Sequence, residues 1–267
     1  MMNIVRQVIY SVYLAAVALL AVPPALAQKS VAPPAEVFAE SKPKDVHTRA
    51  KLHTELGSLY FQNGNWIVAL EELTLAISIN PSYAQAYSTR GLVLYHVKEM
   101  ESAEKDFRQA IDLDGKDPEI NNNYGWFLCR IGKEKESIAY FQRAIDNILY
   151  QTPESAYLNI GTCYARMGEL DLAEAAIRKN LRLAPDNPQA LFQLATISYK
   201  RGNYEAAREH LRSVVRVNEP SAEILWLLLR IERRLADRLA EENYTRQLRR
   251  KFPDSPEYQE LLKGNFE

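Results

Sequence analysis

Two cysteines carry the clearest chemistry in this chain. Cys129 and Cys163 stand 34 residues apart, and the sequence has no other cysteine. In an oxidising compartment an isolated pair predicts a disulfide, with two buried free thiols as the alternative. Both are expected on helices of successive repeats. Packed helices lie ~8 to 10 Å apart and must approach closely for a bridge whose Cα atoms are ~4.4 to 6.8 Å apart, so closure is feasible.

The other residues that often carry chemistry do not form a recognisable catalytic set. The four histidines, His47, His53, His96 and His210, lack metal-ligand spacing, and the sequence contains no GxSxG, HExxH or phosphate-binding glycine loop. A net charge of −1 argues against a nucleic-acid partner, which normally requires a concentrated basic surface. We therefore expect no enzyme, no cofactor, no metal and no small-molecule substrate, and a function that rests on binding other proteins.

The N-terminal segment resembles an export signal. Residues 1–27 combine Arg6, an apolar run from Val8 to Val22, and small residues that end at Ala27. Cleavage after Ala27 is predicted. An uncleaved membrane anchor is the alternative, although the apolar run is shorter than the ~20 residues of a bilayer span. Residues 28–45 are rich in proline and alanine and are interpreted as a flexible linker. No cysteine precedes Cys129, so no lipid anchor is evident and an exported, periplasmic protein is expected.

The positions of four glycines predict the elements that carry these residues. Gly57, Gly91, Gly125 and Gly161 each lie within a helical apolar pattern, at spacings of 34, 34 and 36 residues. Tetratricopeptide (TPR) repeats have a 34-residue period, each unit being a helix-turn-helix. The chain resembles the TPR family in the segments LGSLY, RGLVLY, YGWFL and IGTCY.

Further positions recur in the same register. A small residue of the second helix recurs as Ala69, Ala103, Ser137, Ala173 and Ala207, and turn glycines recur as Gly64, Gly132, Gly168 and Gly202. A plain helical bundle would not require this recurrence. We predict an all-α, right-handed superhelical TPR solenoid over residues 46–267. Its repeats span approximately 50–83, 84–117, 118–153, 154–187, 188–221 and 222–255, with a capping helix at 256–264.

Two predicted units are irregular. The third is two residues longer than the period, which lengthens either its second helix or the turn between Ile148 and Thr152. The sixth has Leu229 at the glycine position and is interpreted as degenerate.

Stacked TPR units form a groove lined mainly by first helices, and function is expected there. The family pattern often has an asparagine at the sixth residue of a unit and a cation at the thirteenth. The matching pairs are Asn123 with Arg130, Asn159 with Arg166, and Gln193 with Lys200. Such a ladder is suited to binding a peptide backbone and an acidic group. The alternative is that these are consensus residues without a special ligand.

Aromatic residues occupy the same expected face in the first three units. Phe61, Tyr95, His96 and Trp126 would provide a shelf for an apolar partner segment, unless they only pack units together. The complete set of candidate groove residues is Phe61, Tyr95, His96, Asn122, Asn123, Trp126, Arg130, Asn159, Arg166 and Lys200.

Within the TPR family, the chain resembles the type IV pilus biogenesis and stability proteins of the PilF/PilW family. The resemblance rests on NNNYGWFLC at 121–129, YFQRAIDNILYQTP at 140–153 and LRRKFPDSPEYQELL at 248–262. It implies a periplasmic accessory that helps the outer-membrane secretin to assemble or remain stable, by non-covalent binding in the groove. Cysteines matching Cys129 and Cys163 in some relatives favour the bridge. Family members are usually lipoproteins, so the missing lipid-attachment cysteine is a departure.

Two other functions fit the same fold. One is a periplasmic scaffold for another envelope machine, such as cell-wall synthesis or division. The other is a chaperone-like adaptor for an envelope enzyme. Partner choice in TPR proteins depends on shape and scattered residues, so the convex face is a possible contact surface beside the groove.

Overall fold

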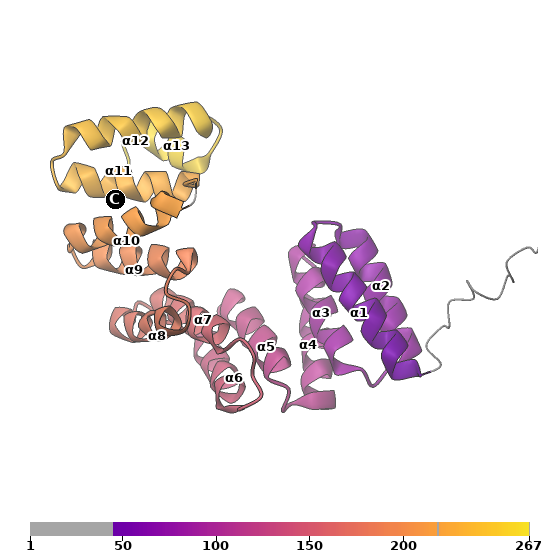
Figure 1. Cartoon of the computed structure of the whole chain (residues 1–267). Helices are drawn as coiled ribbons and strands as arrows, with labels where there is room; N and C mark the ends of the chain where they lie inside the picture. The colour runs from indigo at the N-terminus through magenta and orange to yellow at the C-terminus, as the bar shows by residue number, and fades with distance from the viewer. Residues whose placement is uncertain (1–44, 218, 267) are drawn as a thin grey trace, which may run out of the picture. The chain divides into compact units, whose positions relative to one another are not determined.

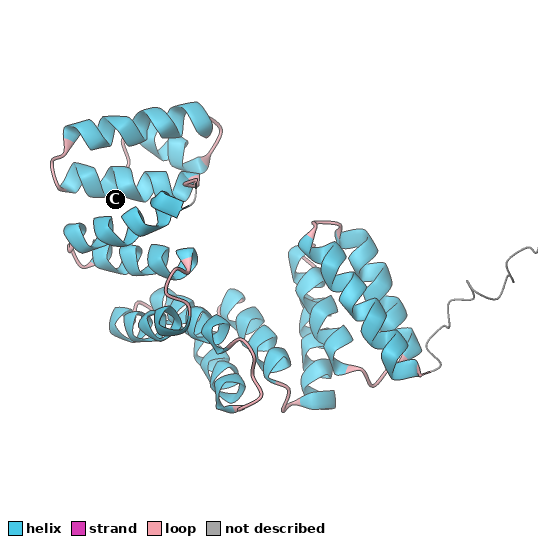
Figure 2. Cartoon of the chain, in the orientation of Figure 1, coloured by secondary structure: helices cyan, strands magenta, loops and turns pink. Residues whose placement is uncertain are grey.

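The computed structural model describes residues 45–217 and 219–266, and all its regular elements there are helices (Figure 2). The predicted signal segment and the linker up to residue 44 lie outside this part of the chain. In order, the helices are α1 (Val46–Gln62), α2 (Trp66–Ile79), α3 (Ala84–His96), α4 (Met100–Asp114), α5 (Pro118–Arg130), α6 (Glu134–Asp146), α7 (Pro153–Arg166), α8 (Leu170–Leu183), α9 (Pro188–Lys200), α10 (Tyr204–Val217), α11 (Ala222–Arg234), α12 (Arg238–Lys251) and α13 (Pro256–Lys263).

Consecutive helices form six packed pairs, from α1 with α2 to α11 with α12 (Figure 1). The first helix of each pair also contacts the first helix of the next pair, so α1, α3, α5, α7, α9 and α11 form a continuous row. The short helix α13 packs against α11 and α12. The predicted all-α fold, with about six helix pairs and a C-terminal capping helix, is confirmed.

Several helices begin at a capping residue followed by proline. The Asp117 carboxylate accepts a hydrogen bond from the Ile120 N–H at 2.9 Å, and Pro118 is the first residue of α5. The same arrangement begins α9 at Asn187 and α13 at Ser255. The cap satisfies a backbone donor that the helix leaves free, and proline has no such donor at the first position. These short signals fix where α5, α9 and α13 begin.

The recurring glycines are explained by close packing within each pair. A Cβ atom added to Gly125 would lie 2.9 Å from the ring of Phe141, which is fully buried on α6. Other pairs make the same close approach, which brings the two helices of a unit together. The full set is Gly57 with Leu73, Gly91 with Phe107, Gly125 with Phe141, and Gly161 with Ile177.

The sixth unit carries a large residue at the glycine position and a smaller residue at the facing position of its second helix. Leu229 on α11 is fully buried at the position where earlier units carry glycine. At the register of Phe107 and Phe141, α12 carries the smaller Thr245. In this unit the large residue thus lies on the first helix and the smaller one on the second, the reverse of units two and three.

The extra residues of the third unit lengthen a turn rather than a helix. Helix α6 ends at Asp146 and α7 begins at Pro153, which leaves a six-residue connection. The Asn147 side chain donates to the Lys116 carbonyl at 2.9 Å, and Tyr150 is buried. Ile148 and Leu149 are 96% and 72% exposed, so the tip of this turn extends into solvent.

Candidate functional site

An aromatic cluster lies at the start of the row of first helices. It consists of Phe61, Trp66, Tyr95, His96 and Trp126, which come from α1, α2, α3 and α5. The His96 ring lies 4.9 Å from Phe61 and 6.2 Å from Trp66 between centroids, and stacks on Trp126 at 6.3 Å. Tyr95 meets Trp126 edge to face at 4.9 Å. The structure thus brings the four predicted aromatic residues together and adds Trp66, which lies on a second helix, where no partner-facing residue was expected.

Two cations make the aromatic cluster electropositive. Arg130 Nε donates to the Tyr95 hydroxyl at 3.3 Å, and its guanidinium carbon lies 5.8 Å from the centre of the Trp126 ring. Lys98 Nζ lies 5.9 Å from the Tyr95 ring. The pKa of His96 is lowered from 6.5 by burial and, further, by the charges of Lys98 and Arg130. His96 is therefore uncharged at neutral pH, and the cluster combines flat apolar surface with a positive rim.

The predicted amide ladder connects the repeats to one another. Asn123 Nδ2 donates to the Ser88 hydroxyl at 3.1 Å, and Asn159 Nδ2 donates to Asn122 Oδ1 at 3.1 Å. Gln193 Nε2 donates to the Thr162 hydroxyl at 2.7 Å. Each amide thus donates one hydrogen bond to the preceding first helix, and peptide binding by this ladder stays a prediction.

Asn122, another predicted groove residue, is mostly buried. Its side chain is only 8% exposed, and it accepts the hydrogen bond from Asn159 across two units. A buried amide requires such a partner. Asn122 therefore joins units three and four and does not present a contact surface.

A second part of the face is hollowed between α7 and α9. A cavity of about 380 Å³ is lined by Arg166, Lys200, Phe192, Gln193 and, among others, Thr162. Within the described part of the chain, the buried Gln193 Oε1 has no hydrogen-bond partner. This cavity brings two of the three predicted thirteenth-position cations together.

A neighbouring cavity extends this part of the face toward α11. Its volume is about 420 Å³, and it shares Phe192 and Gln193 with the first cavity. Glu219 and Glu223 also line it, and Lys251 Nζ donates to Glu219 at 2.6 Å. One cavity is thus lined by two cations and the other by two carboxylates, and Phe192 lines both.

We use the term groove for the aromatic cluster, the cations Lys98 and Arg130, and these two cavities. Arg130, Arg166 and Lys200 end α5, α7 and α9 at the same repeat position, so they form one column along the row. Arg166 Nε also donates to Glu134 at 3.1 Å. The sequence analysis did not predict Trp66, Lys98 and Phe192 as groove residues. Phe192 could have been predicted, because it directly precedes the predicted ladder residue Gln193.

The two cysteines lie beneath this column. Cys129 and Cys163 are bonded to each other in the structure, with Cα atoms 5.9 Å apart, and both are buried. They pack with Phe141 and Ala144 in a core cluster between units three and four. The Ser137 hydroxyl lies 3.5 Å from Cys163 Sγ, so the serine at the alanine position of unit three contacts the bridge.

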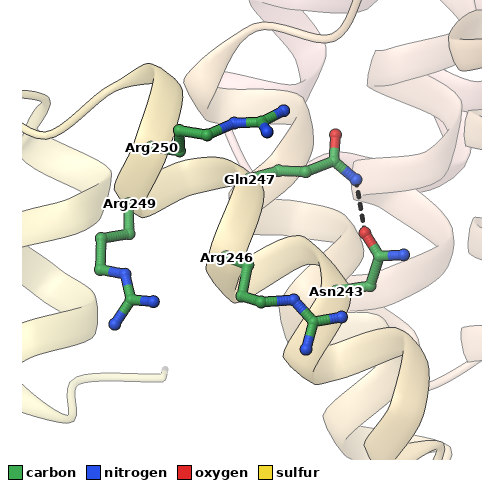
Figure 3. A pocket seen from close by; sticks show the side chains of 5 residues that line it. All are labelled: Asn243, Arg246, Gln247, Arg249 and Arg250. Carbon is green, nitrogen blue, oxygen red and sulfur yellow. Dashed lines mark hydrogen bonds between the residues drawn. The ribbon is translucent and has the colours of Figure 1, made fainter.

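A basic surface lies on a second helix, outside the groove. Figure 3 shows Arg246, Arg249 and Arg250 projecting from α12 around a cavity of about 510 Å³, beside the hydrogen-bonded Gln247 and Asn243. The three arginines lie within about one turn of helix, which the sequence shows as positions i, i+3 and i+4.

The described residues contain no group of three or more histidine, cysteine or acidic side chains placed to hold a metal ion. Across 45–217 and 219–266, no helix combines the length and apolar character of a membrane span.

Comparisons with known proteins agree with this architecture. A sequence model of the tetratricopeptide repeat matches residues 54–118 and 100–153. A model of the middle TPR-like domain of cilia and flagella-associated protein 70 matches residues 132–250. The chain is 29% identical to the type IV pilus assembly protein PilF of Pseudomonas aeruginosa, over 78% of this chain and 83% of that protein.

Two solved structures are similar over most of the chain. The crystal structure of PilW, titled a widely conserved type IV pilus biogenesis factor, is 33% identical and has a TM-score of 0.74. The match covers 80% of this chain and 98% of PilW. A structure of Pseudomonas aeruginosa PilF is 28% identical, has a TM-score of 0.72, and is matched over 82% of this chain and 99% of that one. The chain therefore belongs to the family of tetratricopeptide-repeat proteins that includes PilF and PilW.

Proposed function

We propose that this chain is a non-enzymatic, periplasmic interaction module of type IV pilus biogenesis that assists assembly or stability of the outer-membrane secretin. Similarity to PilF and PilW supports the pilus role. The export-type segment at residues 1–27 supports a place in the envelope. The choice of the secretin as the partner rests on what the family resemblance implies.

The observation that carries the proposal is the column of cations beside aromatic side chains on the first helices. Arg130 lies against Tyr95 and Trp126, while Arg166 and Lys200 line the α7–α9 cavity. An extended partner segment would place apolar side chains on the rings and acidic groups at the cations. Charge-assisted hydrogen bonds and buried aromatic area are the usual sources of affinity in such contacts.

The mechanism requires no bond to be made or broken. Binding one secretin segment would keep an unassembled subunit soluble or oriented for oligomerisation, because a protein that binds one state preferentially shifts its population toward that state. The repeats supply a continuous surface for this, since each first helix contacts the next.

The test is a pull-down from detergent-solubilised envelopes with the tagged mature chain. Recovery of the pilus secretin, identified by mass spectrometry, is the expected result. Recovery only of cell-wall synthesis or division enzymes would reject the secretin and favour the scaffold function. In the same preparation, an N-terminus at Gln28 is expected, and an intact residue 1–27 segment would contradict the predicted cleavage.

A further inference from the structure

The row of groove positions continues onto the last first helix. Arg230 on α11 occupies the same repeat position as Thr162 and Thr196, both of which line the α7–α9 cavity. Its guanidinium carbon lies 4.6 Å from the centre of the Tyr199 ring of α9 and 6.0 Å from that of Trp226. The α11 face is thus an extension of the groove, again made of aromatic rings and a cation.

The chain folds its own C-terminal segment onto this extension. Gly264 ends α13 in the left-handed conformation, at φ 71°, and the Asn265 N–H donates to the Glu260 carbonyl at 3.0 Å. Glycine adopts this conformation without the strain of a side chain. The reversal carries Phe266 back to α11.

Phe266 is held by three separate contacts. Its ring stacks on Trp226 with centroids 5.6 Å apart, and the Arg233 guanidinium carbon lies 3.9 Å from the centre of the same ring. Arg230 Nε donates to the Phe266 backbone carbonyl at 3.1 Å. Aromatic stacking and cation–π attraction can each bind an aromatic side chain, and here both act on one ring whose main chain is also hydrogen-bonded.

A tryptophan–arginine pair is also present at the other end of the row, where Trp126 meets Tyr95 and stacks on His96. In α5, Trp126 and Arg130 are four residues apart with a ring-to-guanidinium distance of 5.8 Å. In α11, Trp226 and Arg230 are also four residues apart, at 6.0 Å and one helical turn earlier in the repeat. Each of the two pairs thus contacts an aromatic ring, which is Tyr95 or His96 at Trp126 and Phe266 at Trp226.

Charge beside the ring defines the rest of the ligand. A cavity of about 410 Å³ is lined by Arg230, Arg233, Arg234, Gly264 and Phe266. Of these cations, Arg233 also donates to Glu241 at 2.8 Å. Three arginines around one cavity favour a carboxylate. In the sequence Phe266 is followed by Glu267, which lies outside the described residues.

We propose that Trp226, Arg230 and Arg233 form a recognition site for an extended segment in which an aromatic residue adjoins an acidic one. The chain's own Phe266 occupies this site, and a partner segment of the same chemistry displaces it. The proposal deepens the proposed function, on which the choice of a protein partner rests.

The experiment uses the mature chain and a variant that lacks residues 264–267 and so retains α13. The probe is a fluorescein-labelled peptide with the sequence of residues 260–267, ELLKGNFE, and binding is followed by fluorescence anisotropy. The shortened chain is expected to bind the peptide at least about fivefold more tightly than the full chain, because the site is no longer occupied. A peptide with alanine in place of phenylalanine should lose this gain.

Two variants separate recognition from folding. Phe266→Ala in the full chain should also admit the peptide, which covers the case in which the shortened chain is poorly folded. In the shortened chain, Trp226→Ala should abolish the gain, whereas Arg108→Gln, at an exposed ion pair on α4, should leave it unchanged.

Equal affinity of the full and shortened chains, or of the phenylalanine and alanine peptides, would overturn the inference. In that case, recovery of the secretin by the full chain would still support the proposed function. Loss of secretin recovery with a positive peptide result would instead reject the proposed partner and keep the site.

Discussion

At the residue scale, the glycines of the first helices matter because of what lies opposite them. Gly125 faces the flat ring of Phe141, with three ring carbons 2.9 to 3.2 Å from where a Cβ would stand. A ring cannot bend away from such a contact as a flexible chain end does. Glycine is therefore required by packing at this position of each unit. This requirement explains why glycine recurs at the spacing of the repeats.

Gly125→Ala is expected to destabilise the protein by up to about 2 kcal/mol. Overpacking a core costs ~1–3 kcal/mol, while alanine regains about 1 kcal/mol of helix propensity over glycine. Urea unfolding of the variant measures the difference. Phe141→Leu should cost less stability in the Gly125→Ala background than in the wild type, because it relieves the contact. A variant more stable than wild type would contradict this packing account.

His96 reports the electrostatics of the aromatic cluster. Burial and the charges of Lys98 and Arg130 lower its pKa below 6.5. The unfolded chain binds this proton more readily, so the contribution of His96 to stability is present above pH 6.5 and is lost as pH falls through the lower folded pKa. Arg130→Gln should raise the pKa of His96 in an NMR titration, while Arg108→Gln should not. An unchanged value in Arg130→Gln would show that Arg130 does not act on the cluster.

Individual side-chain roles were only partly predictable. Phe61, Tyr95, His96 and Trp126 share the face that repeat position assigns to them. Asn123 was predicted to bind a peptide backbone, and its bond to Ser88 on the preceding helix was not predicted. Such hydrogen bonds depend on the distance between neighbouring repeats. The residue pattern within one repeat does not give this distance.

At the element scale, the helix pairs follow from local signals. Caps such as Asp117 before Pro118, and the spacing of small and large residues, recur within each unit and are readable one unit at a time. The placement of the two extra residues of unit three was not readable, because helix extension and turn extension satisfy the same count. Anchoring of Asn147 to the Lys116 carbonyl and burial of Tyr150 favour the turn.

The bridge between α5 and α7 should make a large contribution to stability. Replacing Cys129 and Cys163 by alanine is expected to cost up to about 4 kcal/mol, because the cross-link closes a 34-residue loop in the unfolded chain. Urea unfolding gives the loss, and wild-type protein unfolded under reducing conditions should fall to a similar midpoint.

Alkylation of exported protein under denaturing, non-reducing conditions gives an independent check. Both cysteines should resist modification. Modification of both cysteines would add the mass of two alkyl groups. That result would show free thiols and contradict the disulfide between units three and four.

At the scale of the whole molecule, the row of first helices turns separate residues into one surface. Arg130, Arg166 and Lys200 are 34 to 36 residues apart in sequence yet end neighbouring helices at one repeat position. Recurrence predicted this column. Recurrence could not predict that Phe266 folds back onto α11. The last segment belongs to no repeat, and its contacts depend on where α13 ends.

Affinity for the purified pilus secretin tests the central claim most directly. Arg130→Gln combined with Arg166→Gln should weaken binding at least about tenfold, since each removes a charge-assisted contact. The matched control, Arg108→Gln with Arg178→Gln, removes two exposed arginines paired with glutamates on second helices and should bind like the wild type. Equal affinity of the groove variant and the wild type, with unchanged helicity by circular dichroism, would contradict the account.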